Sequence, residues 1–151
     1  MKRTFCSNRA EVDALNTYVK LTRATEKITA ETHRHLASAD LTYSQFGVLE
    51  AIYHLGPLSQ REIAKKVLKS HGNITLVINN LEKRNLVVRK CNPTDRRFFS
   101  VDLTAEGDAL IKKVFPRHAA GIVRSFGRLT PAEQHELARL CRKLGRGTES
   151  G

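Results

Sequence analysis

Uncharged polar side chains gather on one face of a segment that should be helical. Apolar residues recur in it at i, i+3, i+4 and i+7, and this spacing predicts a helix over residues 70–84 with one buried stripe. The stripe consists of Ile74, Val77, Ile78 and Leu81. Asparagine can bind adenine through two hydrogen bonds, and leucine or a threonine methyl group can contact the methyl group of thymine. From the opposite face and the first turn we expect base contacts in the major groove of DNA by Ser70, His71, Asn73, Thr75, Leu76, Asn79 and Asn80.

Leu76 distinguishes this face from an ordinary solvated helix face, which is the alternative interpretation. It lies opposite the buried stripe, among amides and hydroxyls instead of pairs of Glu and Lys. An exposed leucine in such surroundings indicates a surface that meets a partner. The face holds no arginine, the residue that most often reads guanine, so we expect a core site rich in A·T pairs.

A second cluster of polar residues lies between two segments that have the sequence pattern of β-strands. Residues 86–90 and 98–103 predict a β-hairpin, and residues 91–97 between them have turn chemistry. The inward side of the second strand should hold Phe99, Val101 and Leu103. One arginine at such a tip can enter a narrow minor groove, while another pairs with an aspartate or a phosphate. We expect minor-groove contacts from Asp95, Arg96 and Arg97, the alternative being a solvated loop with a structural Asp–Arg pair.

Positive charge is concentrated around the polar face of the helix at 70–84 and around the hairpin tip. The 151 residues carry a net charge of +11, and residues 59–97 alone hold ten Lys and Arg against three Asp and Glu. A concentrated excess is typical of a surface that binds nucleic acid or an anionic membrane. We expect contacts to DNA phosphates from Lys65, Lys66, Lys69 and Lys83, with Arg89 and Lys90 as further candidates.

Local sequence patterns predict the elements that would position these residues. Ser59 and Glu62 form a capping box before a short helix over 60–68, and a tight turn at 68–72 leads into the amphipathic helix. Two helices joined in this way are a helix-turn-helix. Asn85 stands where a left-handed residue would end the second helix. With the basic hairpin beside it, residues 41–104 predict a winged helix-turn-helix region.

Long helices flank this region. Residues 9–37 lack Gly and Pro and carry a thin apolar stripe, so this helix must lie against something else, such as a second chain. Thr42 with Gln45, and Thr130 with Glu133, predict capping boxes for two further helices. Thr104 should cap a helix that runs to about residue 126 and is kinked at Pro116. We expect one mainly α domain over residues 1–151 with a small β-hairpin.

Composition argues against several other classes of protein. The chain has no GxSxG, HExxH or glycine-rich phosphate loop, so we do not expect an enzyme. The six histidines lack ligand spacing, and we expect neither a metal nor a cofactor. No segment is apolar enough to span a membrane and the N-terminus is polar, which favours a cytoplasmic location. The three cysteines, Cys6, Cys91 and Cys141, form no CxxC pair and should be free thiols.

Residues 41–107 resemble the MarR family of bacterial transcriptional regulators. The similarity is carried, in order, by the stretches LTYSQFGVL at 41–49, GPL at 56–58, GNIT at 72–75, LEKRNLV at 81–87, PTDRR at 93–97 and LTAEG at 103–107. It implies a winged helix-turn-helix homodimer in which residues 9–37 and 104–145 form the dimerisation region. The family's wing motif falls on Asp95 and Arg97, with Arg97 in the minor groove. The chain departs from the family at Leu76, Asn79 and Asn80, where members often have Arg, Asp and Arg.

The resemblance implies a repressor that binds double-stranded DNA at a pseudo-palindromic operator and responds to a ligand. The stretches at 53–56 and 91–97 are similar to the branch that responds to quinones or phenolic compounds, so the ligand would be a small aromatic or phenolic effector. The sequence does not indicate which residues line the ligand pocket. Two alternatives stay open, namely a redox-sensing regulator that acts through Cys6 or Cys91, and a non-specific architectural DNA-binding protein.

Overall fold

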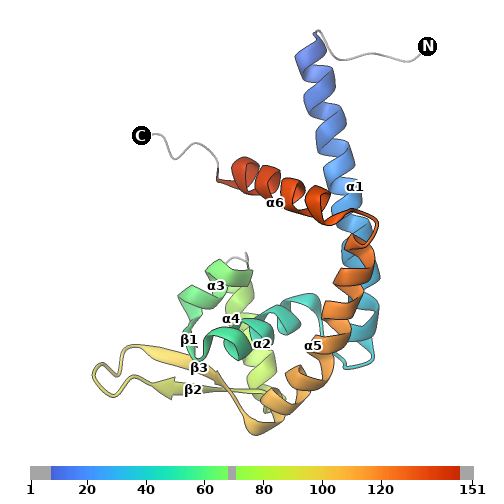
Figure 1. Ribbon diagram of the computed structural model, residues 1–151. Coiled ribbons are helices and arrows are strands. Elements are labelled where there is room, and N and C mark those ends of the chain that lie inside the picture. Colours follow the sequence, from blue (N-terminus) through green and yellow to red (C-terminus); the bar gives the residue numbers. More distant parts are fainter. Residues whose placement is uncertain (1–7, 68–70, 147–151) are drawn as a thin grey trace, which may run out of the picture. The chain divides into compact units, whose positions relative to one another are not determined.

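Within residues 8–67 and 71–146, which the computed structural model describes, the chain forms six helices and one three-stranded sheet (Figure 1). The fold is therefore mainly α with a small hairpin, as predicted. The elements are α1 (Arg9–Ala37), α2 (Tyr43–Leu55), β1 (Leu58–Ser59), α3 (Gln60–Val67), α4 (His71–Lys83), β2 (Val87–Cys91), β3 (Phe99–Leu103), α5 (Ala105–Phe126) and α6 (Pro131–Gly145).

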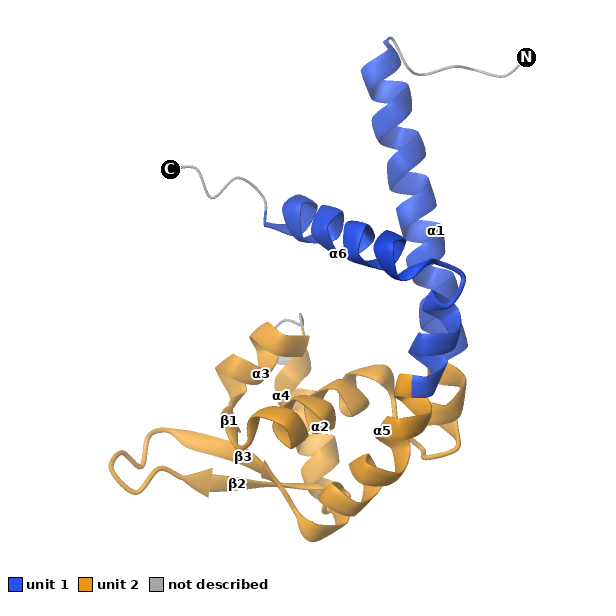
Figure 2. Cartoon of the chain, viewed as in Figure 1, with its two compact units in different colours: residues 1–32, 120–151 blue, residues 33–119 orange. Residues whose placement is uncertain are grey.

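The chain divides into two compact units (Figure 2). One unit, residues 33–119, contains α2, α3, α4, the sheet, the end of α1 and the first part of α5. The other, residues 1–32 and 120–151, contains most of α1, the end of α5, and α6. The predicted functional division into residues 41–104 and the flanking helices stays a prediction.

The unit of residues 33–119 is built around one apolar core. Helices α2, α3 and α4 each bury one side, and strands β2 and β3 and helix α5 close the core. Side chains no more than 2% exposed include Phe46, Leu49, Ile52, Ile63, Ile74, Ile78, Leu81, Val87, Val101 and Ile111. Three of the four residues predicted as the buried stripe of α4 are in this set, and Val77 is half-buried. The core therefore fixes which face of α4 points outward.

The sheet has the order β1-β3-β2 with antiparallel pairing throughout. Strand β1 was not predicted, since two residues are too short to show an alternating pattern. The prediction that Phe99 faces inward is wrong, because its side chain is 44% exposed. Phe99 pairs with Cys91 at the end of the hairpin farthest from Val87 and Leu103, beyond the reach of the core.

Two backbone features join α4 to α5. Asn85 has a φ of 57°, so it ends α4 in the left-handed conformation that was predicted. Thr104 donates from Oγ1 to the carbonyl of Asn85 (2.6 Å) and accepts from the Gly107 N–H (3.0 Å). A Cβ atom at Gly107 would lie 1.9 Å from the Leu86 carbonyl oxygen, so only glycine fits at this close approach.

The unit of residues 1–32 and 120–151 is held together by polar contacts and leaves much apolar surface uncovered. Glu31 accepts from Ser125 Oγ (2.9 Å) and forms an ion pair with Arg128 (3.1 Å), which links α1 to the end of α5 and the segment after it. No residue of α6 is buried. Large apolar side chains stand exposed on both α1 and α6, namely Val12, Leu15, Tyr18, Val19, Leu140 and Leu144. None of the helices in the described ranges has the length and apolar character needed to cross a membrane.

Candidate nucleic-acid interface

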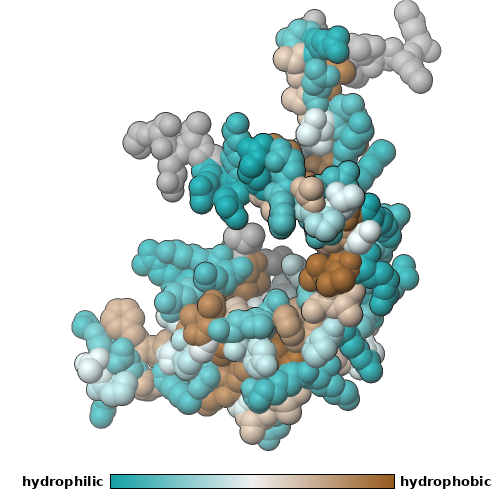
Figure 3. All heavy atoms as spheres, in the orientation of Figure 1, coloured by the Kyte–Doolittle hydropathy of each residue, from teal (hydrophilic) through white to brown (hydrophobic). Residues whose placement is uncertain are grey.

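Helices α3 and α4 form the two helices of the predicted helix-turn-helix. The Ser59 N–H donates to the Glu62 carboxylate (2.8 Å), and the Glu62 N–H donates to Ser59 Oγ (3.2 Å), so the predicted capping box is present at the start of α3. The Ser59 N–H and the Ser59 hydroxyl both donate to the Glu62 carboxylate, which lowers the pKa of Glu62 and keeps it ionised. Ile63 and Ala64 bury the inner side of α3. Its outer side is hydrophilic, as Figure 3 shows, and carries the exposed Lys65 and Lys66.

The outward face of α4 carries most of the residues that were predicted to contact bases. Asn73, Thr75 and Leu76 are exposed, with Leu76 at 59%. Asn79 and Asn80 are half-buried. Ser70 and Lys69 lie outside the described residues, and so does the side chain of His71. An uncharged face thus stands opposite the core stripe of Ile74, Ile78 and Leu81, as the spacing predicted.

Two of these residues are engaged by neighbours that sequence reasoning missed. Gln60, at the start of α3, donates from Nε2 to Thr75 Oγ1 and so joins the two helices of the motif. Arg89, on β2, donates to Asn79 Oδ1 (2.6 Å) and to the carboxylate of Glu82. Neither contact has a local sequence signature, because the partners lie 15 and 10 residues apart.

The connection between β2 and β3 forms a structured wing tip. The Arg97 backbone N–H donates to Asp95 Oδ1 (3.0 Å), and its guanidinium donates to both carboxylate oxygens at 3.1 Å. The Arg97 side chain lowers the pKa of Asp95, and Asp95 raises the pKa of Arg97, so both groups stay charged. The Arg97 side chain is nonetheless 86% exposed. Of the two arginines, Arg97 is thus the one that Asp95 orients, and Arg96 is exposed with no ion pair in the described part of the chain.

The basic residues around α3, α4 and the wing divide into paired and unpaired groups. Arg89 pairs with Glu82, and Lys90 pairs with Asp102 (2.6 Å), so these two candidates for phosphate contact are already neutralised within the protein. Over residues 8–67 and 71–146, no ion pair involves Lys65, Lys66 or Lys83, all three of which are exposed. The unpaired lysines are therefore the predicted residues best placed to attract phosphates.

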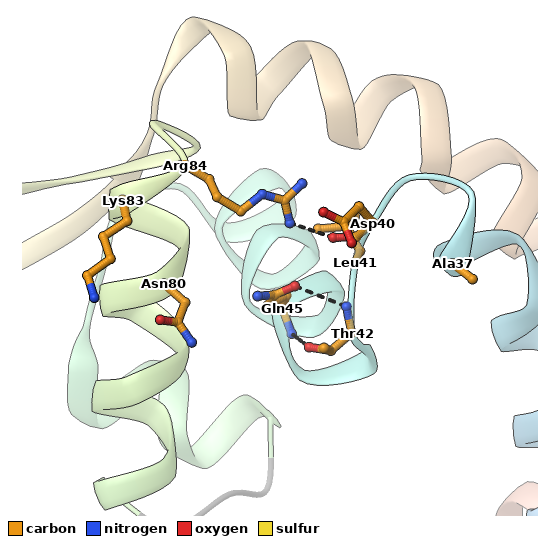
Figure 4. Close-up of a pocket in the computed structure, with 8 residues that line it drawn as sticks. All are labelled: Ala37, Asp40, Leu41, Thr42, Gln45, Asn80, Lys83 and Arg84. Carbon is orange, nitrogen blue, oxygen red and sulfur yellow. Dashed lines mark hydrogen bonds between the residues drawn. The ribbon is translucent and has the colours of Figure 1, made fainter.

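A groove lies beside the C-terminal end of α4 (Figure 4). It has a volume of about 540 Å³ and is lined by Ala37, Asp40, Leu41, Thr42, Gln45, Asn80, Lys83 and Arg84. Thr42 and Gln45 form the predicted capping box at the start of α2, while Arg84 donates to the carbonyl of Asp40 (2.5 Å). Sequence analysis identified Thr42 and Gln45 only as a cap, since nothing local indicates that α2 begins next to the end of α4.

A second cavity, of about 370 Å³, lies among α2, α3 and α5. It is lined by Tyr43, Gly47, Glu50, Ala51, His54, Leu55, Lys66, Val67 and His118. Burial raises the pKa of Glu50, and the lining combines three aromatic rings with the cation of Lys66. The cavity therefore offers stacking surfaces, the cation of Lys66 and the carboxyl group of Glu50 to a small ligand.

The histidines and cysteines do not form a metal centre in the part of the chain that the structure describes. The ring centroids of His33 and Tyr43 lie 4.1 Å apart, and those of His35 and His118 lie 5.5 Å apart, so the two α1 histidines face different partners. Burial lowers the pKa of both His33 and His35. Cys91 and Cys141 are exposed free thiols, and Cys6 lies outside the described residues.

Comparison with known proteins agrees with this arrangement. Residues 41–98 match the family model "MarR family". The Bacillus subtilis transcriptional regulator MhqR is 33% identical over 132 residues, which cover 87% of this chain and 91% of the relative. The Bacillus subtilis transcriptional repressor MdtR is 30% identical over 83% of this chain and 81% of its own length.

Solved structures show the same fold. Bordetella bronchiseptica BpsR, whose DNA binding is regulated by 6-hydroxynicotinic acid, is 30% identical and superposes with a TM-score of 0.77. The match covers 86% of this chain and 98% of BpsR. The order of motifs, the winged helix-turn-helix and these similarities together show that the chain is a DNA-binding transcriptional regulator of the MarR family.

Proposed function

We propose that this protein is a homodimeric, ligand-responsive repressor that binds a pseudo-palindromic operator. The observation that carries the proposal is the exposed, uncharged face of α4 beside a wing whose Arg97 is oriented by Asp95. Basic side chains around α4 and the wing supply affinity by contacting DNA phosphates, while the uncharged face of α4 contacts the bases.

In the proposed complex, the N-terminal part of α4 enters the major groove. Base edges meet Ser70, His71, Asn73, Thr75, Leu76, Asn79 and Asn80. Lys65, Lys66, Lys69 and Lys83 contact phosphates, and the wing residues Asp95, Arg96 and Arg97 lie at the minor groove, with Arg97 inserted. A narrow minor groove has an enhanced negative potential, which attracts a guanidinium without any base-specific hydrogen bond.

The groove beside α4 extends the contact to the DNA backbone. Asn80 and Lys83 of α4 line one side of the groove, and the start of α2, where helix N–H groups carry partial positive charge, lines the other. A phosphate next to the major-groove site would meet Lys83 there.

The dimer is supported by the uncovered apolar side chains of α1 and α6. An exposed set of large apolar residues on otherwise polar helices is typical of a protein interface. Two copies related by a two-fold axis then present two α4 helices to half-sites about 10 base pairs apart, centre to centre.

The ligand is proposed to be a small aromatic or phenolic anion in the cavity lined by Tyr43, His54 and His118. BpsR offers a precedent, because an aromatic acid regulates its DNA binding. Lys66 lines the cavity and is also a predicted phosphate contact, so an anion that pairs with Lys66 would withdraw its charge from DNA.

Footprinting on the DNA upstream of the protein's own gene tests the proposal. One protected palindrome that is lost on addition of phenols, quinones or aromatic acids is the expected result. Diffuse protection would favour an architectural DNA-binding protein instead. Loss of protection with peroxide alone, abolished by Cys6→Ser or by Cys91→Ser, would favour a redox switch.

A further inference from the structure

The side-chain amide of Asn79 has its oxygen already bound by the protein. Arg89 donates from Nη2 to Asn79 Oδ1 at 2.6 Å, and its Nη1 donates to Glu82 Oε2. A guanidinium carries only donors, so the amide atom that faces it must be the oxygen. This contact fixes the orientation of the amide, and the Asn79 nitrogen with its two N–H groups is left to meet other partners.

Arg89 is itself held on both sides. Its side chain is 25% exposed, and the carboxylate of Glu82 pairs with it from the same helix as Asn79. Its backbone belongs to β2, where Arg89 pairs with the buried Val101 of β3. Hydrogen bonds that involve a charged donor are stronger than neutral ones, particularly when water is partly excluded. An incoming base therefore does not readily displace Arg89 from the amide oxygen.

We propose that Asn79 reads DNA as a hydrogen-bond donor only. This inference rests on the proposed function, in which the outward face of α4 enters the major groove. The two-bond contact to adenine needs the amide oxygen to accept from the adenine amino group while the amide nitrogen donates to N7. Arg89 takes one of the two lone pairs of Oδ1, and its positive charge disfavours the approach of a second N–H donor to the other. Asn79 therefore senses the acceptors N7, O6 and O4 of the bases and not their amino groups.

Asn80 provides a comparison within the same helix. It lines the groove beside α4, and within the ranges 8–67 and 71–146 its side chain has no hydrogen-bond partner. Asn80 thus keeps both its donor and its acceptor, whereas the acceptor of Asn79 is shared with the guanidinium of Arg89. The proposal replaces the expectation that both asparagines can bind adenine through two hydrogen bonds.

The test begins with binding sites selected from a randomised DNA duplex by the full-length protein. The same selection is carried out with Asn79→Ala. The base pair that Asn79 contacts is the position at which this variant loses the base preference of the wild-type protein, while it keeps the preferences at all other positions. If Asn79→Ala changes the preference at no position, the proposal is overturned. If the wild-type protein selects no sequence at all, the proposed function fails with it, and the two failures are thereby distinguished.

Base analogues at that position then decide between donor and acceptor. We use 7-deazapurines, 6-thioguanine and 4-thiothymine to weaken acceptors, and unsubstituted purine or 2-pyrimidinone to delete amino groups. For each analogue we divide the affinity of the wild-type protein by that of Asn79→Ala. Effects of the analogue on the duplex itself are the same for both proteins and therefore divide out. We expect this ratio to fall roughly fivefold for an acceptor change and to stay constant on amino deletion. A fall on amino deletion, or no fall with any acceptor change, would contradict the proposal.

Arg89→Met should release the amide oxygen and make amino deletion costly at the same base pair. The double variant Glu82→Gln/Arg89→Met keeps the local charge balanced and should behave in the same way. A merely structural role for Arg89 would instead lower affinity for all analogues by one common factor. Circular dichroism checks folding, and if either variant unfolds, the comparison of wild type with Asn79→Ala decides alone.

Discussion

At the scale of single residues, the chemistry of the interface depends on which polar atoms the protein has already used. Asp95 pairs with Arg97, and Arg96 has no ion pair among the described residues, while Glu82 and Asp102 neutralise Arg89 and Lys90. The sequence indicated that one wing arginine would enter the minor groove while the other paired with an aspartate or a phosphate. In the structure the arginine that pairs with Asp95 is Arg97, the same residue that the family resemblance places in the groove. The bond from Arg89 to Asn79 was not predictable, because it joins a helix to a strand that pack together only in the folded chain.

Arg97→Ala should weaken operator binding and flatten its dependence on salt by about one phosphate equivalent. Gel-shift titrations at several salt concentrations measure both quantities. Arg96→Ala is the matched comparison, since it removes the same charge from the neighbouring wing position that Asp95 does not orient, and it should weaken binding less than Arg97→Ala. An unchanged operator affinity in Arg97→Ala would refute the role of the wing.

Gly107→Ala should destabilise the fold, because its Cβ would lie 1.9 Å from the carbonyl oxygen of Leu86. Overpacking of this kind costs about 1–3 kcal/mol, and the Leu86 backbone cannot move without disturbing the end of α4. Gly121→Ala in the same helix is the control, because its nearest neighbour, Thr32, lies at an ordinary 3.9 Å. Thermal denaturation should show a lower Tm for Gly107→Ala alone, and equal values for both variants would contradict the assignment.

At the scale of elements, periodicity and capping were enough to predict most of the fold. The described bounds of α1 agree with the predicted residues 9–37, and the capping boxes at Thr42, Ser59 and Thr130 are present. These features depend on residues at most a few positions apart, so the sequence shows them directly. Strand β1 and the groove beside α4 depend on packing between distant segments, and the sequence alone did not indicate either.

Glu31→Gln should destabilise the unit of residues 1–32 and 120–151 at neutral pH. Hydrogen bonds from Arg128 and then from Ser125 lower the pKa of Glu31 in the folded state. The carboxylate therefore contributes its full stabilisation above the pKa it has in the unfolded chain, and this contribution is lost as the pH falls through the lower folded pKa.

Thermal melts of wild type and Glu31→Gln between neutral pH and about pH 2 test this expectation. The difference in Tm should be present near pH 7 and should vanish at the acid end. Arg128→Met serves as the control background, because it removes the main cause of the pKa shift of Glu31. In that background, the change in Tm caused by Glu31→Gln should depend less on pH. A difference that is constant with pH would contradict a role for the ionised carboxylate.

At the scale of the whole molecule, the charge and the exposed apolar residues serve different purposes. The net charge of +7 over residues 59–97 belongs to the helix-turn-helix and the wing, while the uncovered apolar side chains belong to α1 and α6. Sequence analysis inferred a partner for α1 from its thin apolar stripe, and the exposure of Leu15 (53%) and Tyr18 (66%) supports that inference.

Leu15→Glu should disrupt the proposed dimer, because it places a charge on the apolar face of α1. Light scattering after size-exclusion chromatography should show a monomer, and operator affinity should fall at least tenfold because only one half-site is engaged at a time. Glu11→Gln, a neutralisation one helical turn away, is the control. A dimer of undiminished stability in Leu15→Glu would place the interface elsewhere.

Selection of binding sites from a randomised duplex by the full-length protein tests the central claim most directly. The account predicts two inverted half-sites about 10 base pairs apart, centre to centre, rich in A·T pairs, with preferences that weaken on substitution of Asn73 or Leu76 by alanine. Enrichment of a single unrepeated site, or of no sequence at all, would contradict the reading of DNA by two copies of α4.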